Sequence, residues 1–236
     1  MVDNMCNASC VIFGATSLTR EEVEGKQIIE VGSYDVNGSL RPIIESWKPA
    51  SYIGVDIQKG PGVDVVCRVE TILDAFGKES FDVVISTELL EHVREWGTVI
   101  SNIKHICRAN GILVVTTRSR GFHYHGYPSD FWRYELADME YIFSDCVIER
   151  LEKDRLAPGV FMRARKPKGF VDKELADYAL HSIIVNRRVR EIDENSLHNF
   201  QRRYRRRQFF KRLERRMRGF IRNRGTTARE KEMESS

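Results

Sequence analysis

Hydrophobic residues in the first two thirds of the chain form short runs that alternate with amphipathic stretches. Val and Ile dominate these runs, as expected for strands of a parallel sheet that helices cover on both faces. The expected strands span residues 27–33, 51–57, 63–69, 80–87 and 112–118, then 146–154 and 159–167 around the turn Ala157-Pro158-Gly159. The pattern predicts a doubly wound α/β fold that ends in a β-hairpin.

Helices are predicted between these strands and after them. Residues 39–47 have Ser39 as the expected N-cap and Pro42 in the first turn, and Asn110-Gly111 is expected to end a helix over 96–108. A third helix is predicted over 129–143, capped by Ser129 or Asp130. Beyond residue 168 only helices are expected, over 173–185 and 187–222. We therefore expect an N-terminal segment (1–22), an α/β domain (23–168) and a helical extension (169–236).

Composition indicates a globular protein: 42% of the 236 residues are hydrophobic and 31% are charged. The five cysteines have no regular spacing, which argues against a disulfide framework or a zinc site. The apolar run over Val11–Phe13 is too short for a signal peptide, and no run reaches the ~18–20 apolar residues that span a bilayer. We expect a cytoplasmic protein.

The net charge of +4 hides an uneven distribution. Residues 169–236 carry 18 Lys or Arg against 10 Asp or Glu, whereas residues 1–168 carry 20 against 24. Between residues 202 and 224 there are twelve basic residues and one acid, and an apolar stripe recurs at helical spacing through Phe210, Leu213, Met217 and Phe220 or Ile221. The stripe suits docking on the α/β domain or a second subunit, an anionic membrane surface at which the protein would be peripheral, or, less well, nucleic acid.

The stretch "IIEVGSYDVNGSL" reads as a buried strand that runs through Gly32 into a helix opened by Gly38. Asp56 ends the next strand, where a carboxylate can accept both hydroxyls of a ribose. The loop lacks the middle glycine of a dinucleotide-binding G-x-G-x-x-G, and Glu30 would repel a pyrophosphate. NAD is therefore disfavoured, and a cationic ligand without phosphate, such as S-adenosylmethionine, suits the loop better.

Four stretches in order resemble the motifs of one family: "EVGSYDVNGS", "YIGVDI", "SFDVVISTELLEHV" and "ANGILVVTTR". The chain resembles a class I S-adenosylmethionine-dependent methyltransferase, of the group typified by type-11 methyltransferase domains, over about residues 23–168. This resemblance implies a Rossmann-like sheet of seven strands, S-adenosylmethionine as the cofactor, and methyl transfer. The basic extension lies outside it.

Carried over by position, the resemblance implies a cofactor-binding set. Glu30, Gly32 and Ser33 would line the methionine part, Asp56 would hold the ribose and Ile57 would pack against adenine. The remaining assigned residues are Gly38, Glu70 and Ser86. Two departures stand out: Arg68 occupies the place of an adenine-binding acid, and the absent middle glycine suggests a longer loop with Asp35 or Asn37 near the pocket.

Methyl transfer is an in-line displacement that requires no metal, so none is assigned, and a hydroxyl acceptor benefits from a nearby base. His92, in "STELLEHV" with Glu88 and Glu91, is one candidate base. His125 and Asp130 are others, within "RGFHYHGYPSDFWRYE". For each residue a structural role is also open: His92 can pack a helix, and Asp130 more readily caps one.

The same segment, residues 120–135, is expected to hold the acceptor. His123 and Tyr124 lie in its loop, Trp132 can stack on a sugar face, and Arg133 can pair with a carboxylate or phosphate. Its "PxDFWRY" pattern is similar to that of methyltransferases thought to act on saccharides. We expect methyl transfer to an oxygen or nitrogen of a small molecule, saccharide or lipid-linked glycan. The alternatives are an RNA methyltransferase that docks through the basic tail and a non-catalytic cofactor-binding protein.

Overall fold

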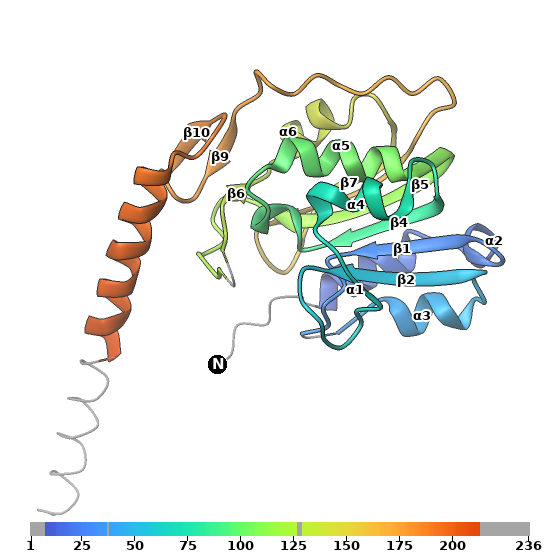
Figure 1. Ribbon diagram of the computed structural model, residues 1–236, viewed down its shortest axis with the longest axis horizontal. Helices are drawn as coiled ribbons and strands as arrows, with labels where there is room; N and C mark the ends of the chain where they lie inside the picture. Colours follow the sequence, from blue (N-terminus) through green and yellow to red (C-terminus); the bar gives the residue numbers. More distant parts are fainter. Residues whose placement is uncertain (1–7, 37, 127–128, 213–236) are drawn as a thin grey trace, which may run out of the picture. The chain divides into compact units, whose positions relative to one another are not determined.

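A computed structural model describes residues 8–36, 38–126 and 129–212 (Figure 1). Seven strands form one sheet in the order β3-β2-β1-β4-β5-β8-β7. Their bounds are β1 Gln27–Val31, β2 Ser51–Asp56, β3 Val65–Val66, β4 Phe81–Thr87, β5 Cys107–Arg118, β7 Val147–Lys153 and β8 Gly159–Arg165. Strands β1 to β5 pair in parallel, and β8 pairs antiparallel with β5 and β7. The predicted doubly wound sheet with a terminal hairpin is confirmed.

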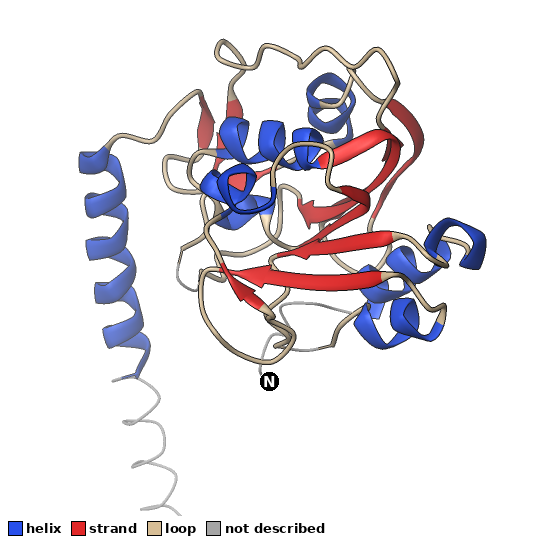
Figure 2. Ribbon diagram, turned by 45° about the vertical axis from the view of Figure 1, so that its right-hand side comes forward, coloured by secondary structure: helices blue, strands red, loops and turns tan. Residues whose placement is uncertain are grey.

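Helices cover both faces of this sheet (Figures 1 and 2). They are α1 Ala8–Thr16, α2 Arg20–Val23, α3 Arg41–Ser46, α4 Ile72–Phe76, α5 Trp96–Ile106 and α6 Leu136–Ile142. Phe13 of α1 and Ile44 of α3 pack in one core cluster with Ile28, Val83 and Ile112 of the strands. Helix α5 buries its apolar side, as its spacing of apolar residues requires.

Several predicted boundaries shift because backbone pairing overrides the local signal. Helix α3 has Leu40 rather than Ser39 as its N-cap, with Pro42 in its first turn as predicted. Asn110-Gly111 does not end a helix: α5 stops at Ile106, and Asn110 lies within β5, where its N–H donates to the Lys166 carbonyl. The predicted third strand keeps only β3, and the 3-10 helix η1 follows over Val69–Thr71.

The helix predicted over 129–143 is wrong in its first half. Trp132–Arg133 forms the short strand β6, and α6 begins only after Glu135, whose side chain caps it reciprocally with Asp138. The predicted helix over 173–185 is also wrong, because Leu180–Ser182 forms β9 and pairs with both β6 and β10 (Arg187–Val189). This three-stranded antiparallel sheet joins two segments about 50 residues apart in the chain.

The chain divides into two compact units, Met1–Glu191 and Ile192–Ser236. In the second, residues 194–212 are helical, so the predicted basic helix exists but starts seven residues later than expected. Phe209 and Phe210 are exposed on it. The other predicted stripe positions (Leu213, Met217, Phe220 and Ile221) lie outside the described residues, and the domain boundaries at 22 and 168 stay predictions. Among the described helices, none combines the length and apolar character needed to cross a bilayer.

Candidate active site

A cavity of about 510 Å³ opens at the carboxyl ends of β1, β2 and β4. Strand order reverses between β1 and β4, which is where ligands bind in doubly wound folds. The predicted cofactor residues that line it are Glu30, Gly32, Ser33, Gly38, Asp56, Ile57 and Glu70. Ser86 is buried within β4 and is not part of the lining, so the structure does not bring it to the cavity.

The loop after β1 folds tightly against β2. Gly32 has a φ of +82°, and a Cβ added there would meet the Leu89 Cβ at 3.0 Å. The backbone N–H groups of Gly32 and Ser33 both donate to the Val55 carbonyl, at 2.9 and 3.1 Å. Asp35 lines the cavity and accepts the Gly38 N–H at 2.8 Å. The Asp35 side chain therefore holds this loop closed. In a shorter, glycine-rich loop, backbone hydrogen bonds would do so.

Glu30 is a buried carboxyl at the end of β1, with 3% of its surface exposed. Burial raises its pKa to about 7, although the Tyr52 hydroxyl, which donates to Glu30 at 2.6 Å, and the Arg41 charge act to lower it. Sequence reasoning missed Tyr52. The signal was available, since parallel pairing sets Tyr52 opposite Ile28 and so on the same face as Glu30. A cation in the cavity would favour the ionised carboxylate.

The ribose and adenine predictions centre on the end of β2. Asp56 accepts the Gln58 N–H at 3.1 Å through one oxygen, and the neighbouring Ile57 is half exposed. Arg68, the departure from the family pattern, pairs with Glu70 at 3.1 Å. Both line the cavity, so the arginine charge is balanced by the acid two residues later.

A second group of polar side chains follows β4. His92, at the end of the 3-10 helix η2 (Leu90–His92), lines the cavity, and its Nδ1 lies 2.5 Å from the Ser129 carbonyl oxygen. Glu88 also lines it and adopts a left-handed backbone with a φ of +56°. Burial raises the pKa of Glu88, as does the charge of Glu91, and Glu88 pairs with the buried Arg118.

Asp130 lies in a buried ionic network and does not cap a helix, which corrects the structural role expected for it. Arg133 donates to both of its carboxylate oxygens, at 2.5 and 2.7 Å, and the His125 Nδ1 is 2.9 Å away. Burial would raise the pKa of Asp130, but the hydrogen bonds from Arg133 and then His125 outweigh it and hold the pKa well below its ordinary value. The carboxylate is thus an acceptor fixed in its ionised form, which makes it unsuited to the predicted role of base.

The predicted acceptor residues Trp132 and Arg133 are enclosed by the protein. Trp132 is 1% exposed, its indole N–H donates to the Arg94 carbonyl at 3.1 Å, and its ring packs edge-on against Trp96. The Arg133 guanidinium donates hydrogen bonds to the Asp130 carboxylate and to the His123 carbonyl. Neither side chain has a free surface for a sugar or an anion, because the two point to opposite faces of strand β6 and the protein covers both.

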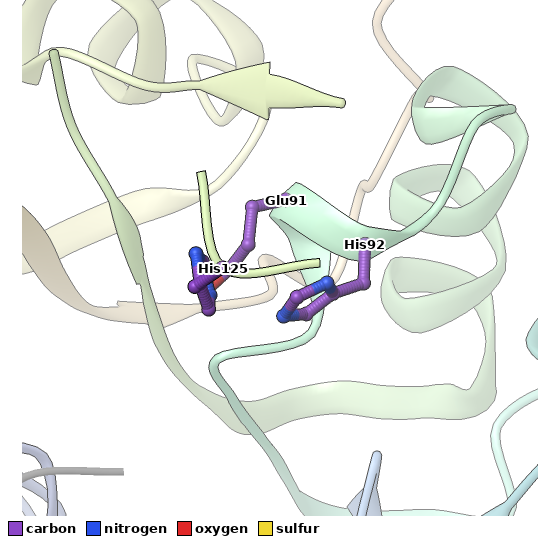
Figure 3. Close-up of side chains that lie close together, drawn as sticks. All are labelled: Glu91, His92 and His125. Carbon is purple, nitrogen blue, oxygen red and sulfur yellow. The ribbon is translucent and has the colours of Figure 1, made fainter. Parts of the chain in front are cut away.

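Three side chains from two separate segments converge beside the cavity (Figure 3). Glu91 and His92 come from η2, after β4, and His125 comes from the loop after β5. One ligand-type atom from each lies within 4.8 Å of the others. The figure shows Glu91 and His125 close together with the His92 imidazole beside them. The carboxyl ends of adjacent parallel strands β4 and β5 bring these segments together.

A family model described as a methyltransferase domain matches residues 37–115, from the loop after β1 through most of β5. Over these residues the chain is similar to a methyltransferase domain. No curated protein matches the chain.

Solved structures share the fold of this chain. A Burkholderia thailandensis 1,6-didemethyltoxoflavin-N1-methyltransferase with bound 1,6-didemethyltoxoflavin and S-adenosylhomocysteine has a TM-score of 0.56 and 13% identity, over 70% of this chain and 80% of that one. An S-adenosylmethionine-dependent methyltransferase from Mesorhizobium loti has a TM-score of 0.54 and 14% identity, over 69% and 100%. Magnesium protoporphyrin IX methyltransferase from Synechocystis PCC 6803, with bound SAM, has 0.50 and 16%, over 66% and 77%.

The predicted residues fall into two groups. Those assigned to the cofactor line the cavity, apart from Ser86. Of those assigned to chemistry or to the acceptor, only His92 does so. The others are not among the lining residues: His123, Tyr124, His125, Asp130, Trp132 and Arg133. The lining residues that the sequence did not assign to the site include Arg94, Ser129 and Phe131.

Proposed function

We propose that the protein binds S-adenosylmethionine in the 510 Å³ cavity and transfers its methyl group to an oxygen or nitrogen of a small polar acceptor. The observation that carries the proposal is the pairing of a buried Glu30 with Asp56 at adjacent strand ends, on the cavity where strand order reverses. One carboxyl suits a cationic ligand and the other a ribose, which together describe this cofactor and not a dinucleotide.

The cofactor would lie along the ends of β1 and β2. Glu30 would face the ammonium of the methionine part, and Ser33, whose buried hydroxyl makes no hydrogen bond within the described residues, would meet its carboxylate. Asp56 would accept the ribose hydroxyls, and Ile57 and Val69 would enclose the adenine. This assignment uses the glycine loop without requiring a pyrophosphate site.

The reaction would take place on the wall formed by His92, Ser129 and Phe131. The acceptor's lone pair forms a bond to the methyl carbon while the carbon–sulfur bond breaks and its electron pair stays on sulfur. From a hydroxyl acceptor the products are a methyl ether, S-adenosylhomocysteine and one proton. Alignment of the three reacting atoms supplies much of the rate enhancement, and the His92 lone pair orients the acceptor.

The acceptor class is proposed more broadly than the sequence suggested. The saccharide prediction depended on Trp132 as a stacking surface, and Trp132 is buried. The cavity wall offers hydrogen-bonding groups instead, from His92, Ser129 and Arg94. We therefore propose a small hydroxyl- or amine-bearing acceptor. A lipid-linked glycan stays a prediction tied to the basic helix.

Calorimetric titration with S-adenosylmethionine and S-adenosylhomocysteine, with NAD as a third ligand, tests the proposal. We expect both sulfur compounds to bind and NAD not to. Asp56→Ala should weaken their binding by tenfold or more, about 1.4 kcal/mol. Asp74→Ala removes an exposed carboxylate away from the cavity and should leave affinity unchanged. A folded protein that binds neither sulfur compound would contradict the proposal.

For residues 202–224 we propose peripheral binding to an anionic membrane surface. The described part of this helix exposes Phe209 and Phe210 among seven basic residues in 202–212. The full chain should sediment with vesicles that contain phosphatidylserine and not with phosphatidylcholine vesicles, and a chain ending at residue 191 should do neither. Equal sedimentation of both chains, or binding of RNA by the full chain without vesicle binding, would contradict this.

A further inference from the structure

Polar atoms of three side chains lie close together beside the cavity. The Glu91 Oε1, the His92 Nε2 and the His125 Nε2 are buried and make no hydrogen bond within the described residues. The Glu91 and His125 atoms are 3.9 Å apart, too far for a hydrogen bond. Buried polar atoms are nearly always satisfied, so three unsatisfied atoms at one point require an explanation.

The hydrogen bonds on the far side of each side chain fix which atoms carry protons. The His92 Nδ1 faces the Ser129 carbonyl at 2.5 Å, and the His125 Nδ1 faces the Asp130 carboxylate at 2.9 Å. Both partners can only accept, so Nδ1 carries a proton in each ring, and in the neutral ring, the form that binds a metal, Nε2 presents a lone pair. The Thr117 hydroxyl donates to the other oxygen of Glu91 at 2.9 Å, which leaves Oε1 directed at the two rings.

With both rings neutral, the three side chains direct three lone pairs and no hydrogen toward one point. A water molecule has two hydrogens and leaves one lone pair unsatisfied, whereas a cation satisfies all three. The outer hydrogen bonds to a carbonyl, a carboxylate and a hydroxyl are those that orient metal ligands in proteins. Arg133 in turn donates to Asp130, so the hydrogen bonds that orient the His125 ring continue through Asp130 to Arg133.

We propose that Glu91, His92 and His125 bind a divalent transition-metal cation at the wall of the cavity. Two imidazoles and one carboxylate suit Zn²⁺, Fe²⁺ or Mn²⁺, whereas Mg²⁺ and Ca²⁺ prefer oxygen ligands alone. Ligand distances of about 2.1 Å place tetrahedral donor atoms about 3.4 Å apart, so the 4.8 Å cluster closes with side-chain movement of about 1.4 Å. Three protein ligands leave coordination positions open.

The open positions give the cation a role that rests on the proposed function. His92 lines the cavity, so a metal on its Nε2 lies at the side assigned to the acceptor. The cation would help an acceptor hydroxyl at an open position to give its proton to water, and the oxygen could then attack the methyl carbon while the carbon–sulfur bond breaks and its electron pair stays on sulfur. The site therefore favours an oxygen acceptor over a nitrogen one.

Metal binding can be measured without any acceptor. The chelator-treated full chain would be titrated with Zn²⁺ and with Mn²⁺ by calorimetry, and its thermal unfolding followed with and without each ion. We expect one ion per chain and a metal-dependent rise in Tm. Glu91→Gln, His92→Gln and His125→Gln should each weaken binding at least 100-fold. His198→Gln removes an exposed histidine of the second compact unit and should change nothing.

Thr117→Val provides a variant that leaves all three ligands in place. It removes only the hydroxyl that orients Glu91 and should weaken metal binding by roughly 10- to 100-fold, as loss of an orienting partner does elsewhere. Failure of the proteins to bind either ion, or binding that all five variants retain equally, would overturn the proposal.

Cofactor titration of the same metal-free protein separates the two proposals. S-adenosylmethionine should bind wild type and Glu91→Gln alike, because Glu91 does not line the cavity. Cofactor binding without metal binding would overturn the metal site and leave the proposed function standing. Metal binding without cofactor binding would do the reverse.

Discussion

The two sides of the cavity are built differently. On the cofactor side, each contact comes from the end of a strand or the turn directly after it, as with Glu30 and Asp56. On the histidine side, the wall is held by side chains that bond to one another behind it: His125 to Asp130, and Asp130 to Arg133. The first side is set by backbone position. The second is set by a polar network that only the complete fold assembles.

Because of this difference, we expect substitutions on the two sides to change different properties: ligand affinity on one side and stability on the other. The position of a carboxyl at a strand end is set by the backbone of the sheet. A single substitution there should therefore alter the affinity for the cofactor and leave the fold intact. A buried network has no such independence, because each charge depends on its neighbour for compensation. Substitutions on the histidine side should therefore affect stability first and ligand binding second.

The largest expected effect comes from Arg133→Met. The arginine and Asp130 side chains are 2% and 0% exposed, so the substitution leaves a carboxylate buried without its partner. We expect the free energy of unfolding to fall by about 3–5 kcal/mol, measured by urea denaturation. Arg150→Met breaks an exposed pair with Glu152 and should cost about 1 kcal/mol or less. Equal losses of unfolding free energy in the two variants would show that the buried Arg133–Asp130 pair costs no more to break than the Arg150–Glu152 pair. The distinction drawn for the histidine side would then fail.

The next effect is a pH dependence from Glu30. Its pKa rises from an ordinary 4.5 to about 7 in the folded protein, so the protonated form is the one that folding favours. Stability from this group is fully present below pH 4.5 and is lost as the pH rises through 7, a total of about 3 kcal/mol. Denaturation between pH 5 and 8 should show the loss in wild type.

Glu30→Gln serves as the control for that profile and sharpens it. The variant should lack this part of the pH dependence, while Tyr52 keeps a side-chain oxygen to donate to. In wild type, the affinity for S-adenosylmethionine should rise with pH while the stability falls, improving about tenfold from pH 6 to 8 as the carboxylate ionises. In the variant, the affinity should not change over this pH range. Parallel profiles in the two proteins would show that Glu30 does not titrate in this range.

The smallest effect tests the glycine turn. Gly32→Ala introduces a Cβ at a φ of +82° and 3.0 Å from Leu89, and should destabilise the fold by about 1–2 kcal/mol while weakening cofactor binding. Gly97→Ala, in the first turn of α5 with open space around it, should instead stabilise by up to about 1 kcal/mol. Opposite signs in thermal unfolding would confirm the requirement at Gly32.

The sequence predicted the cofactor side because its signals are local. A run of Val and Ile fixes a strand, and the acid or glycine that follows it must then lie at the carboxyl edge of the sheet, as Asp56 and Gly32 do. The presence of seven strands follows from the same alternation, whereas their order in the sheet does not. The prediction that Ser86 lines the cavity is wrong. Ser86 belongs to strand β4 itself, one residue before its end, and is buried in the packed interior.

The histidine side was harder because its residues obtain their roles from distant partners. "SDFWRYELADMEYIF" has the composition of a helix, but pairing of Trp132 with Ser182 extends its first half. In the folded protein Trp132 is buried, and the helical pattern of the segment did not indicate the strand that places it there. Glu91 and His92 were visible as a pair, but the third member, His125, is 33 residues away.

The pairing of β6 with β9 also sets an order of events during synthesis. Ile183 donates to the Phe131 carbonyl, and His181 pairs with Arg133, so these backbone bonds of the histidine side cannot form until residues 181 and 183 have emerged from the ribosome. The lining residues assigned to the cofactor all lie between Glu30 and Glu70, well before β6. Because chains emerge from the N-terminus, the strand ends assigned to the nucleoside leave the ribosome before the segments that complete the wall assigned to the acceptor.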